Sequence, residues 1–233
     1  MDAITNGVTI KVGSATYHSF TNFGLAIGNT DYISEPEYED IYVDIPGRQG
    51  FLDLSEVIAG RPVYHSREIS IEFGGVKANP NDWDAAISDL RNKFHGKVVQ
   101  LIFDNDTGYY WTGRAEINDF EHGRQLGTFK FEIPSASPFK YSVDIVPNLA
   151  NLSLSSTART ISIPVTGMPV NPEFVLTNTG TSTVTIVANG ITKTVNAVGT
   201  YRWPDIWFDT TTNITAKGPT NGKLSIVYRQ LSL

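Results

Sequence analysis

The chain has 233 residues, of which 40% are hydrophobic and 18% charged, and this composition is typical of a globular protein with one or two domains. It contains no cysteine, which excludes a disulfide framework, a thiol nucleophile and a cysteine-ligated metal site. The formal net charge of −6 argues against nonspecific binding to nucleic-acid phosphates, because such binding needs clustered lysine and arginine.

The N-terminal segment, MDAITNGVTI, has neither a basic region nor an apolar core, so no secretory signal is expected. No stretch approaches the ~18 consecutive apolar residues that a transmembrane helix requires. Both observations predict a protein that is made in a cytoplasm and has no membrane span, wherever it acts later.

The first part of the chain is predicted to consist mainly of strands. Ile41, Val43 and Ile45 alternate with polar residues, as in a half-buried strand. The same period of two runs through residues 9–12, 69–73, 98–103, 109–120 and 129–133.

The segment VDIPGRQGFLDLSE, residues 43–56, interrupts this pattern. Phosphate-binding glycine loops lead into a helix N-terminus, and no helical periodicity follows Phe51. We therefore expect Gly47 and Gly50 to provide positive φ angles in a turn. The turn is predicted to hold Arg48 and Gln49 out from a sheet, with Phe51, Leu52 and Leu54 packing at its base.

One segment has helical periodicity. Trp83, Ile87, Leu90 and Phe94 lie on one face of a helix predicted at about 82–95. Asn81 is expected to cap its first turn, and Gly96 to end it in a left-handed conformation. A single helix among strands predicts an α+β domain in which the helix covers one face of an antiparallel sheet.

The second part of the chain has no segment with convincing helical periodicity. Six short runs rich in β-branched residues predict a β-sandwich. Asn189-Gly190 is the strongest hairpin signal, a type I′ turn, and Asn221-Gly222 is a second.

Both the charge and the amino-acid composition of the chain change near residues 135–142. Residues 1–141 carry 12 lysines and arginines and 20 acids, whereas residues 142–233 carry 6 and 4. We therefore predict two domains, 1–141 and 142–233, with the join inside 140–158.

The sequence gives only weak signals for a catalytic, nucleotide-binding or metal-binding motif. Neither a nucleotide P-loop nor an esterase nucleophile motif occurs, and the four histidines are never at ligand spacing. The segment DNDTG, 104–108, is a tight turn rather than a calcium loop, since Ala115 stands where a bidentate glutamate is needed. No catalytic residue, metal or cofactor is expected.

Two further features admit a second interpretation. The acids at 35–44 suggest a glycoside hydrolase, but such a reaction needs two facing carboxyl groups at a set separation. The aromatics Tyr201, Trp203 and Trp207 form a candidate sugar-stacking platform. The alternative is packing, with Trp207 and Phe208 in the sandwich core and Tyr201 and Trp203 at its rim.

Several linked segments between residues 40 and 142 point to a family. In order, they are VDIPGRQGFLDLSE, GRPVYHSREISIEF, LRNKFHGK, DNDTGYYWTGR and SPFKYS. Together they resemble the distal tail proteins of long, non-contractile-tailed bacteriophages. The last strand, KLSIVYRQLSL, and the sandwich pattern resemble the same family more loosely, and the C-terminal part lacks long insertions.

The resemblance implies a structural virion protein at the distal end of the tail, and not an enzyme. Its N-terminal domain would form a belt-like ring, usually a hexamer, and its C-terminal galectin-like sandwich would project outward. The ring would join the major tail tube protein to the tail-tip or tail-fibre protein and leave a channel for DNA; receptor-binding proteins are further expected partners. Inter-subunit contacts are expected at Arg48, Gln49 and Arg61. The alternatives are a monomeric carbohydrate-binding sandwich and a glycoside hydrolase with a sugar-binding domain.

Overall fold

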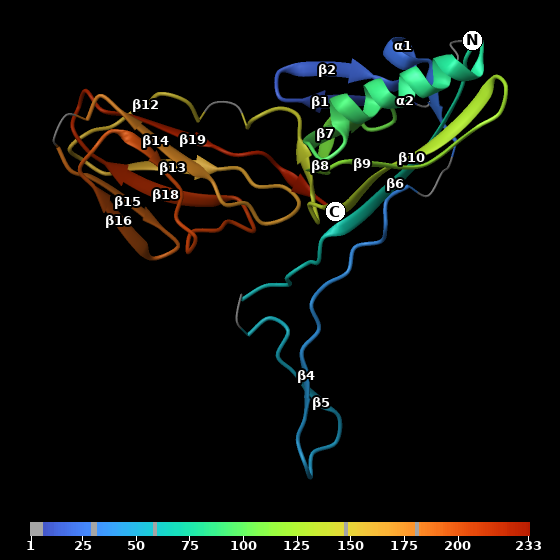
Figure 1. The fold of residues 1–233 in the computed structure, drawn as a ribbon. Coiled ribbons are helices and arrows are strands. Elements are labelled where there is room, and N and C mark those ends of the chain that lie inside the picture. Colours follow the sequence, from blue (N-terminus) through green and yellow to red (C-terminus); the bar gives the residue numbers. More distant parts are fainter. Residues whose placement is uncertain (1–6, 29–31, 58–59, 147–148, 180–181) are drawn as a thin grey trace. The chain divides into compact units, whose positions relative to one another are not determined.

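The computed structural model describes residues 7–28, 32–57, 60–146, 149–179 and 182–233. The chain divides into two compact units, Met1–Lys140 and Tyr141–Leu233, each with its own hydrophobic core (Figure 1). Strands dominate both units, and neighbouring strands within the sheets pair antiparallel. The mainly β, α+β prediction is therefore confirmed.

Unit 1 contains two sheets whose inner faces share one core. In the first sheet four neighbouring strands follow the order β2 (Ala15–His18), β1 (Val8–Val12), β7 (Val98–Phe103), β8 (Tyr109–Arg114). In the second the order is β3 (Leu25–Ile27), β6 (Arg67–Val76), β10 (Leu126–Ala136), β9 (Glu116–His122). A two-stranded ribbon, β4 (Tyr42–Asp44) and β5 (Phe51–Asp53), pairs only with itself. The short strand β11 (Lys140–Ser142) spans the division between the units.

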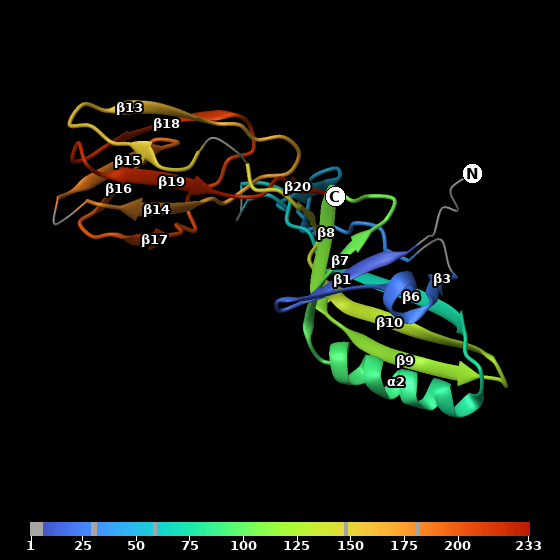
Figure 2. The same cartoon turned by 90° about the horizontal axis from the view of Figure 1, so that it is seen from above.

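Helix α2 (Pro80–Phe94) closes the core of unit 1 beside β9 and β10, as Figure 2 shows. Its buried residues are the four predicted from the helical period, Trp83, Ile87, Leu90 and Phe94. The Phe94 ring meets that of Phe131 on β10 at 6.0 Å between centroids, in an edge-on arrangement. Burial of this apolar stripe is what fixes the helix on the sheet.

The start of α2 differs from the prediction. The N-cap is Asn79, not Asn81, and its side-chain oxygen accepts a hydrogen bond from the backbone N–H of Asp82 at 3.1 Å. Pro80 takes the first helical position, where its missing N–H costs nothing. Gly96 does adopt the predicted positive φ, at 75°. A second, five-residue helix, α1 (Ser19–Phe23), was not expected from the sequence.

The single strand predicted over 109–120 is wrong. The chain leaves β8 at Arg114 and enters the other sheet as β9 at Glu116. Between them Ala115 is fully buried and its backbone N–H donates to the Lys97 carbonyl at 2.9 Å. Alternation alone does not reveal this switch, because the period of two continues across it.

Unit 2 is a sandwich of two four-stranded sheets. One has the order β12 (Leu152–Ser153), β19 (Lys223–Val227), β14 (Glu173–Thr177), β17 (Gly199–Tyr201), and the other β13 (Arg159–Ile163), β18 (Thr212–Lys217), β15 (Val184–Ala188), β16 (Ile191–Val195). The last strand, β20, spans Leu231–Ser232. The inner faces bury alternate residues of each strand, as a sandwich requires.

The two turn predictions in unit 2 have different outcomes. Asn189 and Gly190 have φ of 49° and 77° and join β15 to β16, which confirms the type I′ hairpin. Asn221-Gly222 does not form a hairpin, because the strands on either side, β18 and β19, lie in different sheets. Instead Gly222 closes a turn by donating its N–H to the Pro219 carbonyl at 2.9 Å.

Gly113 on β8 tests how tightly unit 1 is packed. A Cβ built there would overlap Cγ2 of Ile133 and lie 3.1 Å from Cα of Ala136. We expect Gly113→Ala to lower the free energy of unfolding of this unit by about 1–3 kcal/mol through overpacking. Calorimetric unfolding measures it, with Gly108→Ala as the matched control, since a Cβ on Gly108 meets nothing within 4 Å. Equal stability of the two variants would contradict the packing described here.

Tyr228 makes the stability of unit 2 depend on pH in the alkaline range. Burial raises the pKa of Tyr228 from 10.0 to about 12, and its hydroxyl donates to the Pro164 carbonyl. The unfolded chain ionises this group near pH 10 while the folded chain keeps it protonated, so its contribution to stability is complete below pH 10 and is lost as the pH rises towards 12. Denaturant unfolding at pH 8–11.5 should show this fall in the native chain and a smaller one in Tyr228→Phe. Parallel profiles would refute it.

Candidate functional site

The most unusual feature of unit 1 is an arm, which we define as residues 32–66. It leaves the sheet next to β6 and returns at the start of the same strand. At its root Ser34 and Glu68 pair through two hydrogen bonds of 2.9 Å, Ser34 N–H to Glu68 O and Glu68 N–H to Ser34 Oγ. An isolated bridge between Ile33 and Ile69 lies beside them.

Arg67 fastens the root of the arm. Its side chain is only 8% exposed, and both Nε, at 2.7 Å, and Nη2 donate to the Ser34 carbonyl. Its guanidinium also lies 4.8 Å from the centroid of the Trp111 ring. The cation is thus held by a carbonyl and an aromatic ring. Desolvation lowers the pKa of Arg67, and the nearby Glu35 carboxylate raises it.

Beyond the root the two sides of the arm run antiparallel. Glu39 donates its N–H to the Val63 carbonyl at 2.7 Å, and Tyr38 and Tyr64 form a bridge. The Tyr64 ring meets that of Phe139 edge-on, at 5.4 Å between centroids. Backbone pairing thus holds the two sides of the arm to each other, and Tyr64 contacts the body of the unit through Phe139.

The tip of the arm is the hairpin of β4 and β5, which stands clear of both sheets of its unit in Figure 1. Gly47 and Gly50 have φ of 85° and 79°, which confirms the predicted positive angles. The Arg48 N–H donates to the Ile45 carbonyl at 3.0 Å and closes the turn. The loop is therefore the end of a ribbon and not a phosphate cradle.

The hairpin has two chemically different faces. Cross-strand partners share a face, so Asp44 and Phe51 lie together, as do Tyr42 and Asp53. These four residues form what we call the aromatic–acidic face, and the rings of Tyr42 and Phe51 are 6.4 Å apart. The other side, the aliphatic face, is made of Ile41, Val43, Ile45, Leu52 and Leu54.

Both faces carry exposed apolar side chains among the residues that the structure describes. Phe51 is 69% exposed and Tyr42 53%, and on the aliphatic face Val43 and Ile45 are 40% and 37% exposed. The prediction that Phe51 packs at the base of the loop is therefore wrong, and Val43 and Ile45 are more exposed than a half-buried strand predicts. Ile41, Leu52 and Leu54 are half-buried, in line with the prediction. Exposed apolar residues on both sides of a ribbon mark an interaction surface.

The arm is also strongly acidic. Over residues 32–57 it carries seven carboxylates and one cation, Arg48. The pKa of Tyr42 is raised first of all by Asp40, and further by Tyr38 and Asp53. The Asp53 carboxylate accepts hydrogen bonds from Ser55, and these lower its pKa. The tip thus presents negative charge beside aromatic rings.

The residues predicted at subunit contacts all lie on the arm. Arg48 and Gln49 are exposed at the turn, and Arg61 is half-buried on the returning side. Partial burial lowers the pKa of Arg61. Their role between subunits stays a prediction.

A second charged surface, missed in the sequence, is the outer face of the sheet β3-β6-β10-β9. Alternation brings six carboxylates and a single cation onto it: Glu68, Glu72, Glu116, Asp119, Glu121 and Glu132, with Lys130. Lys130 pairs with Asp119 at 2.8 Å, and its pKa is raised chiefly by that hydrogen bond. The signal was present as alternation in β6 and β10, but only strand pairing shows that the acids share a face.

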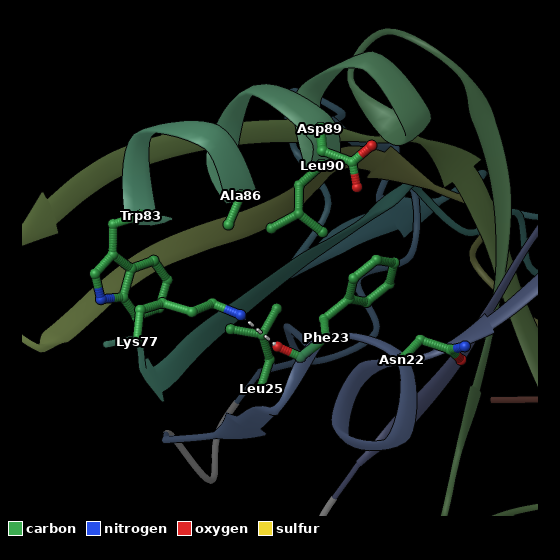
Figure 3. Close-up of a pocket in the computed structure, with 8 residues that line it drawn as sticks. All are labelled: Asn22, Phe23, Leu25, Lys77, Trp83, Ala86, Asp89 and Leu90. Carbon is green, nitrogen blue, oxygen red and sulfur yellow. Dashed lines mark hydrogen bonds between the residues drawn. The ribbon is translucent and has the colours of Figure 1, made fainter. Parts of the chain in front are cut away.

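Figure 3 shows a pocket of about 220 Å³ between α1, β3 and α2. The Lys77 ammonium crosses it and donates to the Phe23 carbonyl at 3.0 Å, while lying 5.7 Å from the Trp83 ring centroid. Its one cation is therefore already held by the protein, and apolar side chains dominate the rest of the lining. We interpret it as a packing gap.

The aromatic residues of the candidate sugar platform are placed around the rim of unit 2. Trp203 stacks on Tyr201 with 5.8 Å between centroids, and its ring also meets buried Phe174 at 4.9 Å. Trp207 donates its indole N–H to the Pro204 carbonyl at 2.8 Å and is half-buried, whereas Phe208 is in the core. The expectation that Trp207 fills the core is therefore wrong, and a sugar platform stays a prediction.

Among the residues that the structure describes, no group of three or more histidines and carboxylates is placed to hold a metal ion. No helix in the same part of the chain is long and apolar enough to cross a membrane.

The root of the arm is open to a direct test. Arg67→Ala should speed amide hydrogen exchange across residues 33–66, because the Ser34 carbonyl loses a charged donor worth about 1.5–3 kcal/mol. Arg67→Lys should restore little, since an ammonium cannot place two donors in the fork geometry of arginine. Exchange in β15 and β18 of unit 2 is the internal control. Unchanged exchange in the arm would show that Arg67 does not hold it.

A scan against protein-family models finds no match, and a search of curated proteins finds no relative. Among solved structures, the chain is similar to the SPP1 Dit protein, described as a paradigm of the hub adsorption apparatus in phages that infect Gram-positive bacteria. The two share 15% sequence identity with a TM-score of 0.64, over 97% of this chain and 99% of that one. At this identity the likeness shows the fold alone.

Proposed function

We propose that this protein is a structural subunit of a phage tail tip, located in the virion at the distal end of the tail. The observation that carries the proposal is the fold shared with the SPP1 Dit hub protein over nearly the whole of both chains. The linked segments between residues 40 and 142 support the same family independently of the fold. A structural subunit also needs no catalytic group, and none was identified in the sequence.

The subunit assembles into a closed ring, a hexamer as the family resemblance implies. The arm supports this part of the proposal, because its apolar faces need a cover from outside the chain. A ring requires an interface between two different surfaces of the same chain, and a projecting ribbon that reaches a neighbour supplies one of them. Residues 1–141 carry ring formation, and Arg48, Gln49 and Arg61 are proposed to lie at or near the contact.

The ring connects the major tail tube protein to the tail-tip or tail-fibre apparatus, with receptor-binding proteins as further partners, and leaves a channel for DNA. The acidic outer face of β3-β6-β10-β9 is suited to line such a channel. Six carboxylates against one ammonium repel phosphates, so DNA passes without being retained. Unit 2 is then free to serve as the attachment module, whether for protein or for sugar.

Shortening the arm tests this function. Leu54 donates its N–H to the Ile41 carbonyl at 2.8 Å, so an Asn-Gly turn can join these two residues and remove 42–53. We expect the native chain to form rings, seen by light scattering and electron microscopy, and the shortened chain to remain monomeric with unit 1 unfolding as before. The tip contributes no residue to the buried core, which is why the fold should survive.

Val198→Asp is the matched control, because it places a charge on an exposed apolar residue of unit 2. It should leave ring assembly unchanged. Native protein that stays monomeric at high micromolar concentration, and still forms no ring beside its tail neighbours, would count against the proposed function itself.

A further inference from the structure

We propose that the aromatic–acidic face of the arm docks on the outer face of strands β1, β7 and β8 of a second copy of this chain. This contact rests on the proposed ring function and specifies which two surfaces meet in it.

The receiving face is an open sheet surface. Strand register places its residues together: Lys11 is opposite Gln100, Gln100 opposite Thr112, and Val98 opposite Arg114. Its members are Thr9, Lys11, Val98, Gln100, Ile102, Tyr110, Thr112 and Arg114, and all are half-buried or exposed. The exposed fraction of Val98 is 57%, which is high for an aliphatic residue in a strand.

The charge of this face is opposite to that of the arm. Lys11 and Arg114 are its only charged members, and both are cationic. Asp104 lies beyond the end of β7, and its carboxylate is already paired with His18 at 3.1 Å. An acidic ribbon therefore meets two cations and no competing carboxylate along these strands.

The other open sheet face of unit 1 is excluded by the same reasoning. The outer face of β3-β6-β10-β9 carries six carboxylates and one ammonium, which is already paired with Asp119. Like charges brought together at an interface are strongly unfavourable, so an arm with seven carboxylates avoids that face. Of these two sheet faces, that of β1, β7 and β8 offers the arm both apolar surface and opposite charge.

The two surfaces also match in pattern. Asp44 and Asp53 are diagonal neighbours on the hairpin, about 7–8 Å apart. Lys11 and Arg114 are two strands and two residues apart, about 12 Å between Cα atoms, and their long side chains can converge on that spacing. Arg114 already donates one N–H to the Gly96 carbonyl and keeps its other donors for a carboxylate.

The rings of Tyr42 and Phe51 complete the match. They cover Val98 and Ile102 and bring aromatic faces close to the two cations, a favourable arrangement for both packing and cation–π contact. Because the arm and the receiving face are different surfaces of one chain, the contact is head-to-tail, and repetition closes a ring.

A charge-exchange experiment tests the docking. The arm variant is Asp44→Lys with Asp53→Lys, and the face variant is Lys11→Glu with Arg114→Glu, both in the full chain. Each alone brings like charges together at every contact, so each should associate at least about tenfold more weakly than the native chain. Mixed in equal amounts they should assemble again, because each arm then meets a face of opposite charge and the two variants alternate around the ring.

Asp144→Lys with Asp209→Lys makes the same change of charge on unit 2 as the arm variant makes on the arm, and should assemble normally. Circular dichroism and calorimetry of the separate variants confirm that each is folded; Lys11→Glu alone replaces the face variant if Arg114→Glu unfolds it. The docking is overturned if either variant assembles like the native chain, or if two folded variants stay apart when mixed. A native chain that never assembles refutes the ring itself, which is a separate result.

Discussion

The proposed assembly depends on an apolar ribbon that stays exposed among the residues the structure describes. Tyr42 and Phe51 are exposed on one face of the β4–β5 hairpin, and Val43 and Ile45 on the other. An isolated two-stranded hairpin is at best marginally stable in water, so the tip needs a partner to have a lasting conformation. The rest of unit 1 positions this ribbon: the Ser34–Glu68 pair and the buried Arg67 fix its root on β6, and the core beneath α2 makes β6 rigid.

The two sheets of unit 1 differ in the charge of their outer faces. One outer face gathers carboxylates, and the other carries cations and aliphatic side chains with no acid along its strands. A surface so divided favours head-to-tail association, because an acidic arm is attracted by one face and repelled by the other. The same division leaves the acidic face free to border a passage for DNA in the proposed ring.

Unit 2 has a different character. Its charges are few, its core is a regular alternation, and its aromatic residues Tyr201 and Trp203 are engaged with each other and with Phe174. Packing therefore already accounts for part of the surface that a sugar would need. Trp207, held by its hydrogen bond to Pro204, remains the member of the group at which a glycan contact is most readily tested by titration.

The sequence by itself determined the elements whose signal is local. The period of α2, the glycine conformations at Gly47, Gly50 and Gly96, and the Asn189-Gly190 hairpin all follow from interactions within a few residues. Tertiary structure decided the features that need a distant partner: the change of sheet at Ala115, the separation of β18 from β19, and the gathering of acids on one face. Alternation at Ile41, Val43 and Ile45 is typical of a strand with one covered face, but it does not say whether the cover comes from the same chain. Val43 and Ile45 stay exposed among the described residues, and that is why a pattern typical of a core strand proved to be a surface.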